Sequence, residues 1–296
     1  MNQRTQIKGI LVLIVILCAV LMIGTIWGVY LFDNAVPAQT ETTASSSVSE
    51  STSSSSSQNT DDDVKPKKMI AITFDDGPNG TYTHQILDLL EQYGAKATFF
   101  VCGYQLKEST KDELQRAIAL GCEIGNHTDT HGSTLTSLTK TPEKLVNELR
   151  AANAKIAELS GTDYQCAVYR PPYGEINRSV AEILTENGIY MYSVHWNSDS
   201  RDWEYRKNYS DGKITREEAV QGTFETVVRE VSEGSVVLMH DIQSITPDVV
   251  ALILEKYTAE GYTFVTVSEL FGFGEMQDNE AYYQRYHAAN RIVAMS

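Results

Sequence analysis

The sequence lacks an excess of basic residues. Its 296 residues include 24 Lys and Arg against 39 Asp and Glu, which gives a net charge of −15 at pH 7. Nucleic acids and anionic lipid surfaces are bound through basic faces, so neither is an expected partner of the folded part. A neutral or amine-bearing polymer is compatible with this charge, although acidity by itself indicates only solubility.

Cysteine is also scarce. Only Cys102, Cys122 and Cys166 lie outside the long apolar run near the N-terminus. An odd number of cysteines cannot pair completely within one chain. Cys102 and Cys122 are expected on neighbouring strands, where a disulfide bridge is possible, but free buried thiols are the favoured interpretation.

Charge is absent from residues 9–32, GILVLIVILCAVLMIGTIWGVYLF. This run is long enough to span a bilayer as a helix. Arg4 and Lys8 precede it and Asp33 follows it, so the positive-inside rule predicts a cytoplasmic N-terminus and an extracellular C-terminal part. A cleaved signal peptide would have a shorter apolar core. We therefore expect a single-pass membrane anchor, with residues 1–8 in the cytoplasm.

Residues 33–67 have almost no apolar side chains to bury and are dominated by serine, threonine and aspartate. Such a composition predicts a disordered linker. With about 30 residues, a flexible coil has a root-mean-square reach of roughly 30 Å. The linker would hold a folded domain outside the membrane.

Short apolar runs alternate with helix-like segments from residue 68 to residue 271. The expected strands are 69–74, 97–102, 123–125, 167–169, 189–194, 235–239 and 264–267. The expected helices lie near 82–93, 109–120, 142–159, 178–187, 216–232 and 246–259. Strict alternation predicts an α/β fold with a parallel sheet, and about seven repeats favour a barrel-like closure.

Active sites of such barrels are built at the carboxyl ends of the strands. Asp75 and Asp76 follow the first expected strand, and adjacent carboxylates repel each other unless a cation lies beside them. Taken alone, the pair is better explained as the cap of a turn or helix. His127 and His131 follow the third strand, four residues apart. That spacing would stack them on one face of a helical turn and offer two imidazoles to one cation, although an isolated pair is a weak signal.

Three further clusters follow later strands. The prolines of RPPYG, residues 170–174, would hold Arg170 and the Tyr173 amide in fixed positions. WNSDSRDW, residues 196–203, combines acids with tryptophans that suit sugar rings. His240 ends an apolar strand. Each cluster also has a purely structural explanation, but five clusters at successive strand ends indicate a single functional rim.

Taken together, these motifs resemble the polysaccharide deacetylases of carbohydrate esterase family four, which contain the NodB homology domain. The resemblance covers about residues 68–270. It depends on TFDDGP at 73–78, HTDTH at 127–131, RPPYG at 170–174, DSRDW at 199–203 and LMH at 238–240, in the family's order. It implies a distorted, incomplete (β/α) barrel.

The resemblance also implies roles for the residues that match the motifs. Asp76, His127 and His131 would bind a divalent metal, usually Zn²⁺, with Co²⁺ or another transition metal as alternatives. Asp75 would be the general base, and Arg170 would hold it in place.

On the other side of the metal, His240 would be the general acid, oriented by Asp199. The Tyr173 backbone N–H would help to bind the oxyanion. Trp203 and Leu238 would line the acetyl pocket.

The expected function is removal of N-acetyl groups from N-acetylglucosamine in an extracellular polymer, with peptidoglycan the nearest candidate. Chitin-type oligomers, poly-N-acetylglucosamine and acetylated xylan are alternative substrates. A non-haem iron oxygenase and an inactive wall-binding module are more distant alternatives. Residues 203–215 are expected to form a long loop and residues 272–296 a helical tail. We expect a monomer by default.

Overall fold

The computed structural model describes residues 68–274. The expected anchor at 9–32, the linker at 33–67 and the tail from residue 275 onward lie outside the described residues. Within 68–274, no helix combines the length and the apolar composition that crossing a bilayer requires.

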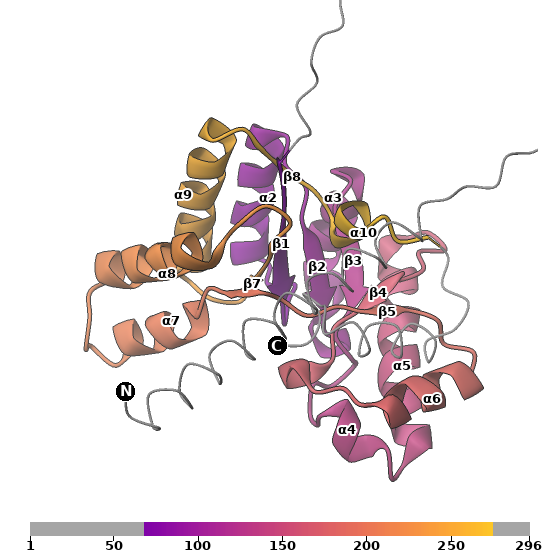
Figure 1. The fold of residues 1–296 in the computed structure, drawn as a ribbon. Helices are drawn as coiled ribbons and strands as arrows, with labels where there is room; N and C mark the ends of the chain where they lie inside the picture. Colours follow the sequence, from indigo (N-terminus) through magenta and orange to yellow (C-terminus); the bar gives the residue numbers. More distant parts are fainter. Residues whose placement is uncertain (1–67, 275–296) are drawn as a thin grey trace, which may run out of the picture. The chain divides into compact units, whose positions relative to one another are not determined.

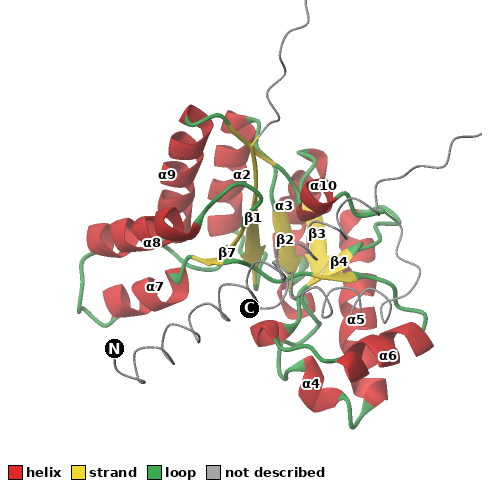
Figure 2. Cartoon of the chain, viewed as in Figure 1, coloured by secondary structure: helices red, strands yellow, loops and turns green. Residues whose placement is uncertain are grey.

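The described residues form one sheet in which every strand pairing is parallel (Figures 1 and 2). The strands are β1 Lys68–Asp75, β2 Thr98–Val101, β3 Glu123–Asn126, β4 Val168–Tyr169, β5 Tyr192–Ser193, β6 Ser198–Asp199, β7 Val236–His240 and β8 Tyr262–Phe264. Seven of them follow one another in the order β5-β4-β3-β2-β1-β7-β6, and β8 pairs with the start of β1. The two ends of this path do not pair, which confirms the α/β fold and the incomplete barrel.

Helices connect every pair of successive strands from β1 to β8 except β5 and β6, as the parallel pairing of neighbouring strands requires. They are α2 Tyr82–Tyr93, α3 Lys111–Ala119, α4 Leu135–Leu138, α5 Pro142–Ser160, α6 Arg178–Glu186, α7 Asp202–Ser210, α8 Arg216–Glu230, α9 Thr246–Ala259 and α10 Val267–Phe271. Figure 1 shows α2, α8 and α9 grouped beside β1 and β7, whereas α5 and α6 lie beyond β4. The sheet thus presents its carboxyl ends along one edge.

Strand β1 lies at the centre of the sheet and is buried on both faces. Ile70, Ile72 and Phe74 belong to the main core, and Ala71 on the opposite face belongs to a second apolar cluster. The buried polar side chain of Thr73 is satisfied, because its hydroxyl donates to the Val237 carbonyl at 2.7 Å. A strand packed on both faces is a rigid base for the two aspartates at its end.

The predicted elements agree with the structure except at strands β6 and β8 and at three helices that were not expected, α4, α7 and α10. Strand β6 was not predicted, and residues 203–215 are not a loop, because α7 occupies most of them. The last strand ends at Phe264, and residues Val267–Phe271 form a helix. Cys102, Cys122 and Cys166 are all free and buried, as the favoured interpretation expected.

Candidate active site

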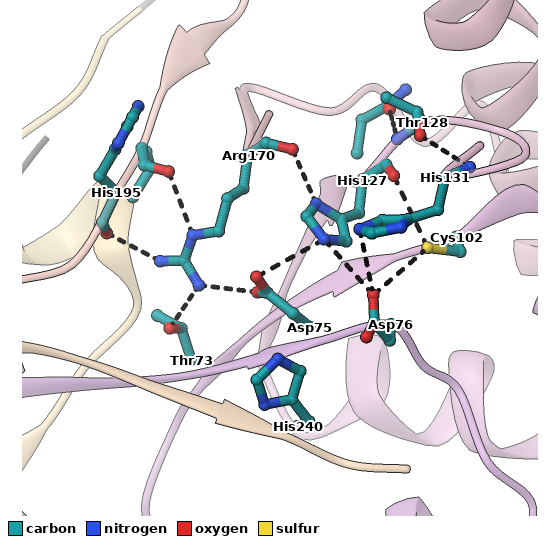
Figure 3. Close-up of polar contacts among 12 residues, drawn as sticks. Thr73, Asp75, Asp76, Cys102, His127, Thr128, His131, Arg170, His195 and His240 are labelled. Carbon is teal, nitrogen blue, oxygen red and sulfur yellow. Dashed lines mark hydrogen bonds and ion pairs between the residues drawn. The ribbon is translucent and has the colours of Figure 1, made fainter. Parts of the chain in front are cut away.

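Side chains from the ends of four strands meet at one rim of the sheet (Figure 3). Asp75 ends β1 and lies opposite His240 of β7 in the strand register. His127 follows β3, and Arg170 follows β4. The register of β1 with both β2 and β7 therefore brings together groups that are up to 165 positions apart in the chain.

Asp76, His127 and His131 could together hold a metal ion. Oδ1 of Asp76 lies 3.5 Å from Nε2 of His127 and 3.5 Å from Nε2 of His131. One donor atom from each residue lies within 4.8 Å of the other two. A carboxylate oxygen and two imidazole nitrogens are a typical ligand set for Zn²⁺ and related transition metals.

The tautomer of His127 is set by its surroundings. Its Nδ1 lies 2.7 Å from the Arg170 carbonyl oxygen, which can only accept, so Nδ1 carries the proton and Nε2 presents a lone pair. Burial lowers the pKa of His127, although the charges of Asp75 and Asp76 oppose this effect. A neutral imidazole with a free Nε2 is the form that binds a metal.

The segment that carries the two histidines is not a helical turn, so that expectation is wrong. Residues 127–134 have no helix or strand assignment. Thr128 and His131 adopt left-handed backbone conformations, with φ of 68° and 51°. The two imidazole rings still meet, at a centroid distance of 4.8 Å. Two residues with left-handed backbone conformations therefore bring the imidazoles together, which one turn of helix was expected to do.

Helix α5 holds this histidine loop, residues 127–131, in place. The Glu148 carboxylate accepts hydrogen bonds from the backbone N–H groups of Asp129 and Thr130, at 3.1 and 2.8 Å, and from the Thr130 hydroxyl at 2.7 Å. The Lys155 ammonium lies 2.6 Å from Asp129 Oδ1. Both side chains of α5 therefore attach to the segment between the two imidazoles.

We expect the substitution Glu148→Ala to weaken metal binding by about 10- to 100-fold, because residues that orient metal ligands contribute on that scale. A competition titration with a chromophoric chelator measures this. Glu158→Ala removes an exposed carboxylate from the same helix and serves as the matched control. Equal metal affinity in both variants would show that Glu148 does not position the loop.

Asp75 is buried and paired with Arg170. The distance from Asp75 Oδ1 to Arg170 Nη1 is 2.7 Å, and Asp75 Oδ2 lies 3.6 Å from His127 Nε2. One carboxylate oxygen is thus held by the guanidinium, while the other faces the metal-binding group. The two adjacent aspartates have different surroundings, since among residues 68–274 Asp76 contacts both histidines and no arginine.

Arg170 is completely buried. Its guanidinium donates to the carbonyl oxygens of Val194 and His195, at 3.1 and 2.8 Å, and to the Thr73 hydroxyl at 2.8 Å. It also lies over the Phe100 ring, 4.1 Å from the centroid. A buried cation with all these partners has one orientation, and it fixes the Asp75 carboxylate.

Asp202, and not Asp199, contacts His240. The distance between His240 Nδ1 and Asp202 Oδ1 is 2.7 Å, and Asp202 Oδ2 accepts from the His240 backbone N–H at 2.7 Å. Asp202 is fully buried at the start of α7. The Asp199 carboxylate instead accepts from the Arg201 backbone N–H at 2.9 Å. The prediction that Asp199 orients His240 is therefore wrong, because the turn at Arg201 directs the next acid inward.

The surroundings of His240 favour its protonated form. Burial lowers the pKa of His240, but the adjacent Asp202 carboxylate and the charges of Asp75 and Asp76 outweigh burial and raise it to about 10. Since Nδ1 faces Asp202, Nε2 is the nitrogen that remains for a ligand in the site. The arrangement can supply a proton at neutral pH.

The remaining predicted residues also lie at this rim. Tyr173 is 66% exposed, and its ring lies 5.0 Å from that of His131. Leu238 is buried on β7, two residues before His240. Trp203 follows Asp202 and is 48% exposed. All ten predicted side chains thus belong to one edge of the sheet, and Asp202 is added to them.

Non-glycine residues with positive φ are concentrated at the same rim. Among residues 68–274 they are Asp76, Thr128, His131, Tyr173 and Arg201, with φ between 51° and 72°. Each belongs to one of the sequence motifs. A left-handed conformation costs a residue with a Cβ atom about 1–2 kcal/mol. The site is therefore the part of the described backbone where local strain is gathered.

Known proteins resemble this chain over the same region. The family model described as polysaccharide deacetylase matches residues 62–192. A peptidoglycan-N-acetylglucosamine deacetylase of Bacillus cereus is 36% identical over 216 residues, which cover 70% of this chain and 90% of that protein. A peptidoglycan-N-acetylglucosamine deacetylase of Listeria monocytogenes is 32% identical over 75% of this chain, which spans only 42% of that protein.

A solved structure extends the comparison to the fold. The family 4 acetyl xylan esterase of Clostridium thermocellum, in complex with a cobalt ion, superimposes with a TM-score of 0.56 at 28% identity. The match covers 69% of this chain and 91% of that one. Sequence, fold and the gathered motifs agree, and the chain belongs to the polysaccharide deacetylase family.

Proposed function

We propose that this protein removes the N-acetyl group from N-acetylglucosamine residues of an extracellular polysaccharide, most directly peptidoglycan, and releases acetate. The observation that carries the proposal is the meeting of Asp76, His127 and His131 beside Asp75 and His240, which are neighbours on β1 and β7 (Figure 3). The names of the Bacillus and Listeria relatives support the substrate.

Asp76, His127 and His131 would hold the divalent metal, and Zn²⁺ suits these ligands best. Such an ion, when bound, lowers the pKa of its water and polarises the acetyl carbonyl. Asp75 would accept the proton of the attacking water through the oxygen that Arg170 leaves free. Because the partners of Arg170 fix its orientation, the Asp75 carboxylate keeps its position during the reaction.

His240 would donate a proton from Nε2 to the amide nitrogen while the C–N bond breaks. The Tyr173 backbone N–H would donate to the oxygen that gains negative charge. Trp203 and Leu238 would enclose the acetyl methyl group. Water adds to the acetyl carbon, so the products are acetate and a free amine on the sugar.

We further propose that residues 9–32 anchor the enzyme in the cell membrane, with its catalytic domain outside. The support is the uncharged run of 24 residues, preceded by Arg4 and Lys8. An anchored enzyme with a long linker would act on polymer close to the membrane. Peptidoglycan meets that condition more directly than free chitin-type oligomers or poly-N-acetylglucosamine do.

The test is product analysis with the purified full-length protein. We expect acetate release from peptidoglycan, loss of that activity after treatment with a chelator, and recovery on addition of Zn²⁺. Mass spectrometry should show the loss of one acetyl group per modified sugar. No acetate from any substrate in the metal-loaded enzyme would contradict the proposal and favour a binding module.

Two other outcomes identify the alternatives. Acetate from acetylated xylan but not from peptidoglycan would make the protein an O-acetyl esterase, the activity named for its Clostridium relative. Turnover that requires oxygen and iron would indicate a non-haem oxygenase, in which Asp75 and His240 would have no evident task. Acetate release under anaerobic conditions would indicate hydrolysis, whereas an oxygenase would be inactive without oxygen.

A further inference from the structure

Tyr104 is an exposed aromatic residue at the active-site rim that the proposed reaction does not use. It lies in a short 3-10 helix, Gly103–Gln105, just past the carboxyl end of β2. Its side chain is 44% exposed. Within residues 68–274 its hydroxyl makes no hydrogen bond. A tyrosine held at the surface without a partner is available for a ligand.

The backbone of Tyr104 is fixed against the histidine loop. Its N–H donates to the Asp129 carbonyl at 2.8 Å, and the Gly103 N–H donates to the Thr128 carbonyl at 3.0 Å. A Cβ atom on Gly103 would lie 2.0 Å from Asp129 Oδ1, so only glycine permits this approach. Tyr104 therefore has a fixed place beside the segment that carries both metal-binding imidazoles.

The phenol also lies within electrostatic reach of the metal-binding group. Partial burial raises the pKa of Tyr104 to about 12, and the nearby Cys102 and Asp76 act in the same direction. Cys102 itself contacts the Asp76 carboxylate, with 3.9 Å between Sγ and Oδ1. Cys102, two residues before Tyr104, thus contacts the metal-binding group directly, which places Tyr104 at the same rim.

Trp203 occupies the other side of the metal-binding group. It follows β6, whereas Tyr104 follows β2, and β1 and β7 lie between these strands. Three strand spacings amount to about 14 Å along the sheet. The reacting groups of β1 and β7 are therefore flanked by an exposed aromatic ring on each side, which matches a chain of sugar rings lying across the site.

We propose that Tyr104 stacks on the sugar ring next to the one that loses its acetyl group, on the side opposite Trp203. The inference rests on the proposed function. Pyranose rings present apolar C–H faces, and an exposed tyrosine ring offers a flat apolar surface with little entropy to lose. The ligand class is a polymer of N-acetylated hexosamines of at least two residues, and the stacking makes the enzyme selective for chains over single sugars.

The experiment compares Tyr104→Ala and Tyr104→Phe with the unmodified protein on N-acetylglucosamine and its pentamer. We expect Tyr104→Ala to lower kcat/KM for the pentamer by about 3- to 10-fold, mainly through KM, since aromatic contacts contribute on that scale. Activity on the single sugar should be unchanged. Tyr104→Phe keeps the ring and should keep most of the activity.

The matched control is Tyr190→Ala. Tyr190 is also 44% exposed, but it precedes β5 and so lies at the amino end of the sheet. The proposal is overturned if Tyr104→Ala loses activity equally on both substrates, or on neither. Isothermal titration of the pentamer into each variant gives a readout independent of turnover. If the unmodified protein binds the pentamer without hydrolysing it, the proposed function fails while the stacking is still tested by Tyr104→Ala.

Discussion

Replacing Asp75 with asparagine is expected to lower kcat by about 10²- to 10⁴-fold while the protein still binds its metal, because a positioned general base contributes on that scale. Asparagine keeps an oxygen that can accept from Arg170 Nη1, as Asp75 Oδ1 does at 2.7 Å. It cannot accept a proton from water. Acetate release measured beside a metal-binding titration checks both halves of the result.

His127→Ala supplies the contrast for this experiment. It removes an imidazole that lies 3.5 Å from Asp76 Oδ1, so metal affinity and turnover should fall together. Asp75→Asn also leaves the buried Arg170 with one anionic partner fewer, which destabilises a domain. Thermal melting of each variant therefore accompanies the kinetics. A fully active Asp75→Asn protein would rule out Asp75 as the base.

The second large effect is expected for Asp202→Asn. The buried Asp202 carboxylate binds both Nδ1 and the backbone N–H of His240. Its loss should lower kcat by about 10²-fold or more, because the His240 imidazole can adopt other tautomers and orientations when the Asp202 carboxylate no longer holds it. Asp199→Asn is the matched control from the same motif and should leave kcat within a few-fold of the unmodified protein.

The pH dependence distinguishes this role from simple structural damage. His240 must be protonated to donate, so activity should be present below its raised pKa, about 10, and be lost as the pH rises through it. Removing the Asp202 charge lowers that pKa, and the alkaline limb of the kcat profile should move to lower pH. A lower kcat with an unmoved alkaline limb would contradict the role given to Asp202.

Much of the fold could be predicted from the sequence because its elements carry local signals. The boundaries of α2 and α9 follow from apolar periodicity, and β1 is a continuous buried run. Strand β6 has only two residues and no periodicity. Helix α7 carries few apolar residues, and only Asp202 of its nine residues is buried. These two elements bury few apolar side chains, so their sequences carry no hydrophobic periodicity from which they could be predicted.

The site was predictable where a functional residue directly follows the end of a predicted strand. Asp75, Asp76 and Arg170 each stand at the end of a strand that the sequence predicts. The motif DSRDW contains two acids, and the choice between them depends on the backbone at Arg201, where φ is 54°. Glu148 gave no signal, since a glutamate on a long helix is ordinarily a surface residue. Its task exists only because α5 packs beside the histidine loop.

The five residues with positive φ have a consequence for evolution and engineering. Their combined cost, about 5–10 kcal/mol, is comparable to the whole margin that keeps an ordinary domain folded. The packing of the barrel interior must hold these residues in place. Mutations that loosen the packing at distant core positions should therefore lower catalytic activity before they lower solubility. Substitutions that relieve the strain at these five residues should raise thermal stability but lower turnover, so selection cannot increase both at this edge of the sheet.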